Sequence, residues 1–149
     1  MRLLLVCNPG GHFATMMGLK RFWQSHHRQW VTYRKYDTEQ LPGTETVHWV
    51  MMQEARMVLR AFLNFWRALW ILLQVRPDAV ISTGASLAVP FIVAAKLFGI
   101  HTVFIESISR SQQLSLSGRM VYNLADEFYV QWPDCLERYP KAQYRGIVA

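Results

Sequence analysis

Three short stretches of this sequence combine small residues with side chains that can move a proton. They are "NPGGH" (8–12), "STGAS" (82–86) and "FIESISRS" (104–111). In the first, the adjacent Gly10 and Gly11 would let backbone amides approach an anion or a sugar, and the following helix N-terminus would add partial positive charge. The imidazole of His12 could then act as a general base. The simpler alternative is a pair of turn glycines and a histidine that caps the helix.

Glu106 is the candidate base of the third stretch. It ends an apolar strand, where desolvation of a carboxylate is costly unless the group has a partner. Arg110 lies four residues later and could be that partner, which would make the pair structural. Alternatively, Glu106 could accept hydrogen bonds from substrate hydroxyls or act as a base. In the second stretch, Thr83 and Gly84 precede a helix and could contact a ligand, although small residues are common in such loops.

The glycine loop departs from the pattern of a dinucleotide-binding site. Such sites need GxGxxG and an acidic residue at the end of the second strand, whereas here the third glycine is missing and that strand ends in Arg34-Lys35. NAD is therefore not expected. Because a basic pair could bind a 2′-phosphate, an NADP-dependent reductase stays a weaker alternative.

Cysteine and histidine usage argues against a metal site. Cys7 and Cys135 lie outside any CxxC spacing, and the five histidines are scattered. Cys7 ends an apolar strand and is expected to be buried and inert. We expect no metal, no cofactor and a reducing cytoplasmic environment.

The elements that must position these loops alternate between strands and helices. Apolar runs predict strands at 2–7, 30–34, 46–50, 78–82, 101–106, 127–131 and 143–148, and helices at about 13–24, 53–75, 87–98 and 117–125. The alternation predicts an α/β fold: one domain over residues 1–149 with a doubly wound, mostly parallel, Rossmann-like sheet. Loops 8–12, 83–87 and 107–116 leave the carboxyl ends of strands, so they should converge on one crevice.

The composition is that of a basic globular protein. With 149 residues, 52% hydrophobic content and a net charge of +6, the chain can bury a core and suits anionic partners. No run of Lys and Arg exceeds two residues and no nucleic-acid-binding motif appears, so nucleic acid is not expected. The amino-terminal apolar run is too short for a signal peptide, and a membrane-spanning helix is not expected because no long apolar run is free of charge.

The long helix predicted over 53–75 is unusually apolar. Its polar side chains form one stripe, Gln53, Arg56, Arg60, Asn64, Arg67 and Gln74. Packing on a sheet needs only about 100° of apolar arc, so the remaining apolar surface must meet another helix, a second subunit or lipid. Arginines beside tryptophans suit anionic head groups, and a helix wholly buried in protein is the alternative. The residues expected to contact a membrane or partner are Arg56, Arg60, Phe62, Phe65, Trp66, Arg67 and Trp70.

Four motifs carry a family resemblance: "VCNPGGH", "ISTGAS", "FIESISR" and "SLSGRMVYNLADEFYVQWP" (115–133). Together they resemble the family containing the membrane-anchor subunit of the two-subunit transferase that adds the second GlcNAc to the dolichol-linked oligosaccharide. The same family includes the bacterial PssD and CpsF exopolysaccharide glycosyltransferase subunits. The resemblance covers nearly the whole chain. A more distant similarity links Gly10, Gly11, His12 and Glu106 to the amino-terminal half of MurG, a GlcNAc transferase.

The resemblance implies a GT-B glycosyltransferase divided between two chains. This chain would be the acceptor-side half, equivalent to the amino-terminal half of a GT-B enzyme and peripheral on the cytoplasmic face of the inner membrane. A partner subunit would complete the heterodimer and hold most of the UDP-sugar. The acceptor of the sugar would be a lipid-diphosphate-linked saccharide, in polysaccharide or oligosaccharide biosynthesis. A non-catalytic scaffold that recruits a complete transferase to the membrane is the alternative from another class.

The same resemblance suggests roles for individual residues. His12 or Glu106 would deprotonate the acceptor hydroxyl. Arg110 would orient Glu106 or contact phosphate, and Ser117-Gly118 would cap the helix that follows. The acceptor-binding residues would be Gly10, Gly11, Thr83, Gly84, Ser107, Arg110, Ser117 and Gly118.

Overall fold

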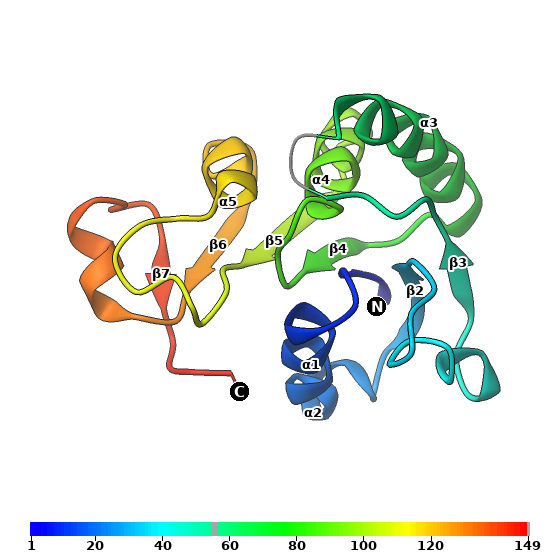
Figure 1. Ribbon diagram of the computed structural model, residues 1–149, viewed down its shortest axis with the longest axis horizontal. Coiled ribbons are helices and arrows are strands. Elements are labelled where there is room, and N and C mark those ends of the chain that lie inside the picture. Colours follow the sequence, from blue (N-terminus) through cyan, green and yellow to red (C-terminus); the bar gives the residue numbers. More distant parts are fainter. Residues whose placement is uncertain (55–56, 149) are drawn as a thin grey trace.

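The computed structural model describes residues 1–54 and 57–148. They form a seven-stranded sheet of order β3-β2-β1-β4-β5-β6-β7 in which every pair of neighbouring strands is parallel (Figure 1). The strands are β1 (Arg2–Val6), β2 (His27–Thr32), β3 (Val47–Trp49), β4 (Ala79–Ser82), β5 (His101–Ile105), β6 (Glu127–Val130) and β7 (Gln143–Tyr144). The predicted doubly wound α/β fold is confirmed.

Helices cover both faces of the sheet. On one face lie α3 (Val58–Val75), α4 (Ala88–Leu97) and α5 (Leu116–Val121), and on the other lie α1 (Gly11–Gly18) and α2 (Lys20–Trp23), beneath β1 and β2 (Figure 1). Two short 3-10 helices, η1 (Leu41–Gly43) and η2 (Pro133–Glu137), complete the elements. The central β1 contributes Leu4 and Val6 to one core cluster and Leu3 and Leu5 to the other. A strand buried on both faces needs this continuous apolar run.

Several predicted boundaries were wrong. The helix predicted over 13–24 is divided into α1 and α2 at Gly18, a residue that weakens helices. The strand predicted over 30–34 begins at His27, because pairing with β1 extends back along it. The final strand covers only Gln143–Tyr144. The long helix begins at Val58 rather than at residue 53.

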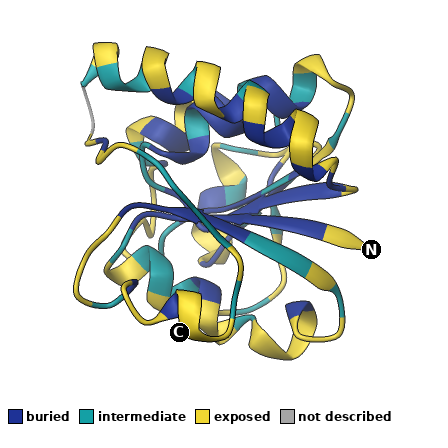
Figure 2. Cartoon of the chain, turned by 90° about the vertical axis from the view of Figure 1, so that its right-hand side faces the viewer, coloured by how far each residue is buried: buried dark blue, intermediate teal, exposed yellow. Residues whose placement is uncertain are grey.

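Helix α3 buries one stripe and exposes a broad apolar surface. Its buried residues are Asn64, Ala68, Ile71, Leu72 and Val75. The surface that faces away from the sheet, which we call the α3 face, consists of the exposed Leu59, Phe62, Leu63, Trp66, Trp70 and Leu73 (Figure 2). This confirms the predicted excess of apolar surface. Among the described residues, α3 is also long and apolar enough to cross a membrane, but 28% of it is buried against the rest of the fold.

The two faces of the sheet are not covered equally. In the described part of the chain, α1 and α2 leave the lower side of β5 and β6 partly open (Figure 1). A hollow of about 430 Å³ lies there, and Ile81, Val103, Ile105 and Tyr129 are among its lining residues. We call this region the open sheet face. The fold therefore presents a second apolar surface in addition to the α3 face.

Candidate functional site

A polar cleft of about 350 Å³ opens at the carboxyl ends of the strands. It is lined by residues that follow β1, β2, β4 and β5 and by the start of α5, so the three predicted loops do converge. Four of the predicted site residues line it: His12, Ser107, Arg110 and Ser117. Among the described residues of the lining, Arg110 carries a positive charge and Glu54 a negative one.

His12 is held in a defined orientation on the cleft wall. Its Nδ1 lies 2.9 Å from the Thr83 carbonyl oxygen, and the Thr83 hydroxyl donates to the His12 carbonyl oxygen at 2.6 Å. Because a carbonyl oxygen only accepts, the neutral ring must carry its proton on Nδ1, which leaves a lone pair on Nε2. A Cβ at position 84 would come within 3.1 Å of Nδ1, and the φ of Gly84 is +104°. Thr83 and Gly84 therefore position His12.

Glu106 is buried beneath the loop that follows β5, with 1% exposure. Its carboxylate accepts hydrogen bonds from the backbone amides of Ser107 and Ser115, at 2.8 and 2.9 Å, and from the Ser115 hydroxyl. Pairing with Arg110, one of the two alternatives that the sequence left open, is not formed: these donors bind the carboxylate, while Arg110 is exposed on the cleft wall. Glu106 is not among the residues that line the cleft. In this geometry it fixes the loop 107–115.

The cap of α5 is Ser115 and not Ser117. The Ser115 Oγ accepts a hydrogen bond from the Gly118 amide at 3.0 Å while its hydroxyl donates to Glu106. A Cβ on Gly118 would collide with Glu106 Oε2, so glycine is needed for the carboxylate to lie under this helix. Ser117 is buried, with 8% exposure, and lines the cleft.

The glycine loop is already bound to a carboxylate within the chain. The Gly10 amide donates to Asp37 Oδ2 at 2.6 Å, and Gly10 has a φ of +91° that favours glycine. Neither Gly10 nor Gly11 lines the cleft. The first bond within α1 is donated by Ala14 to Gly10. The amides that remain for an anion are therefore those of the first turn, from Gly11 onward.

A buried amide network that the sequence did not reveal connects the cleft to α3. Asn8 accepts from the Leu87 amide and donates to the Gln53 carbonyl oxygen. The Gln53 side chain donates to the Ser86 carbonyl oxygen at 2.8 Å and accepts from Asn64 Nδ2 at 2.9 Å. Gln53 and Asn64 were predicted to share one polar stripe with the arginines of the helix. Both are instead buried, and their amides bind backbone groups. A polar residue directly after a buried strand, as Asn8 is, was the available signal.

The cysteines are not candidate nucleophiles. Cys7 is buried as predicted, and burial raises its pKa far above the ordinary range. Burial, together with the nearby Glu106, also raises the pKa of Cys135, whose thiol donates to the carbonyl oxygens of Arg110 and Ser111. Within residues 1–54 and 57–148, no group of three potential ligands could hold a metal ion.

Most of the residues predicted to contact a membrane or partner lie on the surface of α3. Phe62, Trp66 and Trp70 are exposed on the α3 face, and the Arg67 guanidinium lies 4.8 Å from the centre of the Trp70 ring. Arg60 donates to the Met52 carbonyl oxygen. Phe65 instead packs partly against the core, so little of it can reach a neighbour. Arg56 lies outside the described residues.

Comparisons with solved structures show one fold. MurG from Acinetobacter baumannii aligns with a TM-score of 0.76 at 16% identity, over 99% of this chain and 45% of that one. The UDP-N-acetylglucosamine 2-epimerase from Rickettsia bellii also aligns with a TM-score of 0.76, at 12% identity, over 98% of this chain and 44% of that one. The chain therefore has the fold of a domain that makes up just under half of these proteins.

Sequence comparison is more specific. The model of the family described as "Oligosaccharide biosynthesis protein Alg14 like" matches residues 40–148. The UDP-N-acetylglucosamine transferase subunit ALG14 of Mus musculus is 36% identical over 122 residues, and that of Homo sapiens is 34% identical over 122 residues. Each alignment covers 78% of this chain and 55% of the relative, so the chain spans about half the length of these proteins. The chain belongs to the Alg14-like family of oligosaccharide biosynthesis proteins.

Proposed function

We propose that this chain is the acceptor-binding subunit of a glycosyltransferase whose donor site lies largely on a second chain. The observation that carries the proposal is His12, whose Nε2 lone pair is fixed on the wall of a polar cleft by the Thr83 carbonyl. Two relatives are named as subunits of a UDP-N-acetylglucosamine transferase. The fold also amounts to just under half of MurG. Donor and acceptor are accordingly a UDP-sugar and a lipid-diphosphate-linked saccharide.

His12 is the proposed general base of the reaction. Nε2 accepts the proton of the acceptor hydroxyl as that oxygen bonds to the anomeric carbon of the donor sugar and the bond to the nucleoside diphosphate breaks. Nδ1–H keeps its bond to the Thr83 carbonyl throughout, so the ring that becomes positively charged is stabilised by an oxygen dipole. Glu106 has a positioning role, because both oxygens of its carboxylate accept hydrogen bonds from the loop 107–115.

Arg110 is the proposed contact for the acceptor's diphosphate. It is exposed on the cleft wall, and His12, in the first turn of α1, lines the same cleft. A guanidinium and free helix amides are both suited to phosphate oxygens. The neighbouring Glu54 would repel a second anion, which favours one diphosphate in a single orientation.

The α3 face is the proposed membrane contact. Apart from the apolar side chains, α3 carries the arginines Arg60 and Arg67 and contains no Asp or Glu. An apolar surface beside cations suits the interface with anionic lipid, and the five buried residues of α3 keep the helix on the domain rather than across the bilayer. We therefore place the protein as a peripheral subunit on the cytoplasmic face of the membrane.

The open sheet face is the proposed contact for the partner subunit. Its rim differs from that of the α3 face because it carries charges of both signs, the carboxylate of Glu127 and, in an adjoining hollow, the guanidinium of Arg145. An apolar centre with a mixed polar rim is typical of protein interfaces. Two separate apolar surfaces thus receive two different neighbours.

The experiment is sugar transfer by the chain reconstituted with its donor subunit. His12→Gln should lower kcat by about 10²-fold or more, because glutamine cannot take up the proton. Its free energy of unfolding should stay within about 0.5 kcal/mol of the wild type. Glu106→Gln is the matched control: it should destabilise the fold by about 1–3 kcal/mol, because an amide offers one acceptor where the carboxylate has two. Near wild-type turnover of His12→Gln would overturn the assignment of the base.

A scaffold that binds no substrate makes a different prediction. In that case, a donor subunit fused to an unrelated membrane anchor would transfer sugar without this chain. We expect no transfer from the fusion alone and recovery when the chain is added. Recovery should be absent when the added chain carries His12→Gln.

A further inference from the structure

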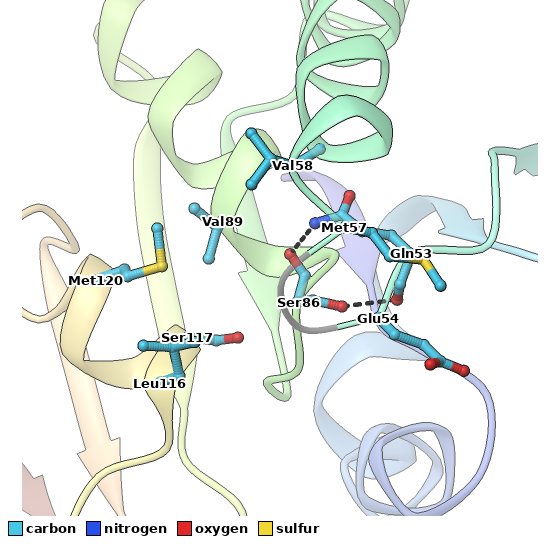
Figure 3. A pocket seen from close by; sticks show the side chains of 10 residues that line it. Gln53, Glu54, Met57, Val58, Ser86, Val89, Leu116, Ser117 and Met120 are labelled. Atoms are coloured by element: carbon cyan, nitrogen blue, oxygen red, sulfur yellow. Dashed lines mark hydrogen bonds between the residues drawn. The ribbon is translucent and has the colours of Figure 1, made fainter.

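An apolar groove of about 290 Å³ adjoins the polar cleft. It runs between the start of α3 and α5, with α4 as its floor (Figure 3). Met57 and Val58 line it on one side, Met120 and Leu116 on the other, and Val89 projects from α4 between them (Figure 3). Ala61 of α3 is also among the lining residues. The wall at Ser86 is fixed by two hydrogen bonds with Gln53, at 2.7 and 2.8 Å. These bonds hold this part of the groove wall in place.

The groove and the cleft are continuous at one end. Four residues line both of them: Glu54, Ser86, Leu116 and Ser117. From His12 and Arg110 the surface thus changes from polar to apolar across a single boundary. A molecule that fits both parts must change polarity at the same point.

The other end of the groove leads toward the α3 face. Val58 lines the groove and is 78% exposed, and the next residue, Leu59, belongs to the α3 face. On the opposite wall Met120 is 55% exposed. The apolar lining of the groove thus reaches the surface at Val58 and Met120, beside the α3 face that is proposed to meet the membrane.

We propose that this groove binds the first isoprenoid units of the acceptor lipid, next to its diphosphate. The inference rests on the proposed function, which places the acceptor's head in the cleft. A polyprenyl diphosphate changes from charged to purely apolar at its first ester bond, which matches the boundary at Ser86 and Ser117. Burial of methylene and methyl groups away from water is favourable, so this short segment would raise acceptor affinity. Through the groove, the enzyme would recognise the lipid of the acceptor as well as its sugar.

The test compares two acceptors with the reconstituted pair in detergent, where membrane attachment has no influence. Both are saccharide diphosphate esters, one with a four-unit prenyl tail and one with an ethyl tail. Ala61→Phe fills the groove, and Met120→Gln makes an exposed part of its wall polar without disturbing the core. For both variants we expect the KM of the prenyl acceptor to rise about tenfold, equivalent to 1.4 kcal/mol, with kcat unchanged. The kinetics of the ethyl acceptor should not change.

The matched control is Leu97→Gln, at an exposed position of α4 outside both the groove and the α3 face, which should affect neither acceptor. The groove proposal would be overturned if the groove variants raised the KM of both acceptors equally, or if the wild type had the same KM for the prenyl and the ethyl acceptor. Inactivity of the wild-type pair with both acceptors would instead overturn the proposed function. A photoreactive prenyl diphosphate gives a readout without turnover: it should label Met57 or Met120 in the wild type and not in Ala61→Phe. Labelling of other residues only would contradict the proposal. That result is expected if the groove holds a side chain of the partner subunit instead of the lipid.

Discussion

At the scale of single residues, the structure distinguishes the two candidate general bases, the imidazole of His12 and the carboxylate of Glu106, between which the sequence did not decide. His12 reaches the cleft, whereas Glu106 lies under the loop 107–115 with three donors on its carboxylate. Both residues end or follow an apolar strand, so their surroundings look alike in the sequence. The difference comes from a loop that folds back and brings Ser115 to a carboxylate nine residues earlier. Spacing along a chain predicts helical neighbours but not partners across such a loop.

Gly118→Ala tests how firmly that carboxylate is held. The new Cβ would collide with Glu106 Oε2, which cannot move without losing its hydrogen bonds to Ser115. We expect a loss of about 1–3 kcal/mol in the free energy of unfolding, measured by urea denaturation. Gly43→Ala is the control, because no atom lies within 4 Å of its Cβ position. Similar stability of the two variants would show that the carboxylate moves freely.

At the scale of elements, α3 shows where a helical projection misleads. Asn64 was grouped with Arg60 and Arg67 on a polar stripe, yet its amide bonds both backbone groups of Met51, at 3.1 and 3.3 Å. The segment that precedes the helix folds over it and supplies these partners. A helical projection assumes that polar side chains are exposed to solvent. A buried amide whose hydrogen bonds are all made within the protein does not follow this assumption. The apolar excess was nevertheless predictable, because the number of apolar positions does not depend on their orientation.

Asn64→Leu should therefore cost far more than a polar-to-apolar change elsewhere on α3. It leaves the Met51 groups and Gln53 Oε1 without their partner, and we expect a loss of about 1–3 kcal/mol in the free energy of unfolding. Gln74→Leu, at an exposed position of the same helix, should change stability by about 0.5 kcal/mol or less. Equal effects of the two substitutions would mean that the network contributes nothing.

The amino ends of β5 and β6 are held together by a pH-sensitive pair of carboxylates. Burial would raise the pKa of Asp126, but hydrogen bonds from Lys96 and Thr102 outweigh it and lower the pKa overall. Hydrogen bonds from His101 and Tyr129 lower the pKa of Glu127. Because the pKa of each carboxyl is lower in the folded than in the unfolded state, the two carboxylates stabilise the fold at pH values above their ordinary pKa range. This contribution is lost as the pH falls from about 5 to about 3.

The double variant Asp126→Asn, Glu127→Gln removes this dependence. It should be less stable than the wild type at pH 7, and the difference should shrink as the pH falls through that range. The measurement is urea denaturation of both proteins at several pH values. A difference that stays constant from pH 7 to pH 3 would exclude these carboxylates as the source of acid sensitivity.

At the scale of the whole molecule, the two apolar surfaces should behave independently. Trp66→Glu with Trp70→Glu changes exposed side chains of the α3 face, and we expect binding to vesicles with 30% anionic lipid to fall by about tenfold or more while binding to the donor subunit persists. Phe22→Asp, at the 45% exposed edge of the hollow in the open sheet face, should give the opposite pattern. Leu97→Glu is the control, exposed on α4 and outside both surfaces. Loss of both kinds of binding from either variant would show that the surfaces are one interface.

The overall architecture could be predicted from the sequence because it depends on alternation. Continuous apolar runs such as Leu3 to Cys7 identify strands buried on both faces, and the loops after them must lie at one edge of a parallel sheet. The open sheet face could not be predicted in this way. Its residues, Val103 and Tyr129 among them, are as apolar as those under α1, and no local pattern shows which half of a sheet lacks a helix.

The open sheet face also has a consequence for the life of the protein in the cell. If the proposed membrane and partner contacts are made, a chain that is synthesised before its partner exposes two apolar surfaces, which chaperones and proteases recognise. Association with either neighbour removes one of these surfaces and stabilises the folded form by mass action. The steady-state amount of the chain should therefore follow the expression level of its companion, a form of stoichiometric control that needs no dedicated regulator.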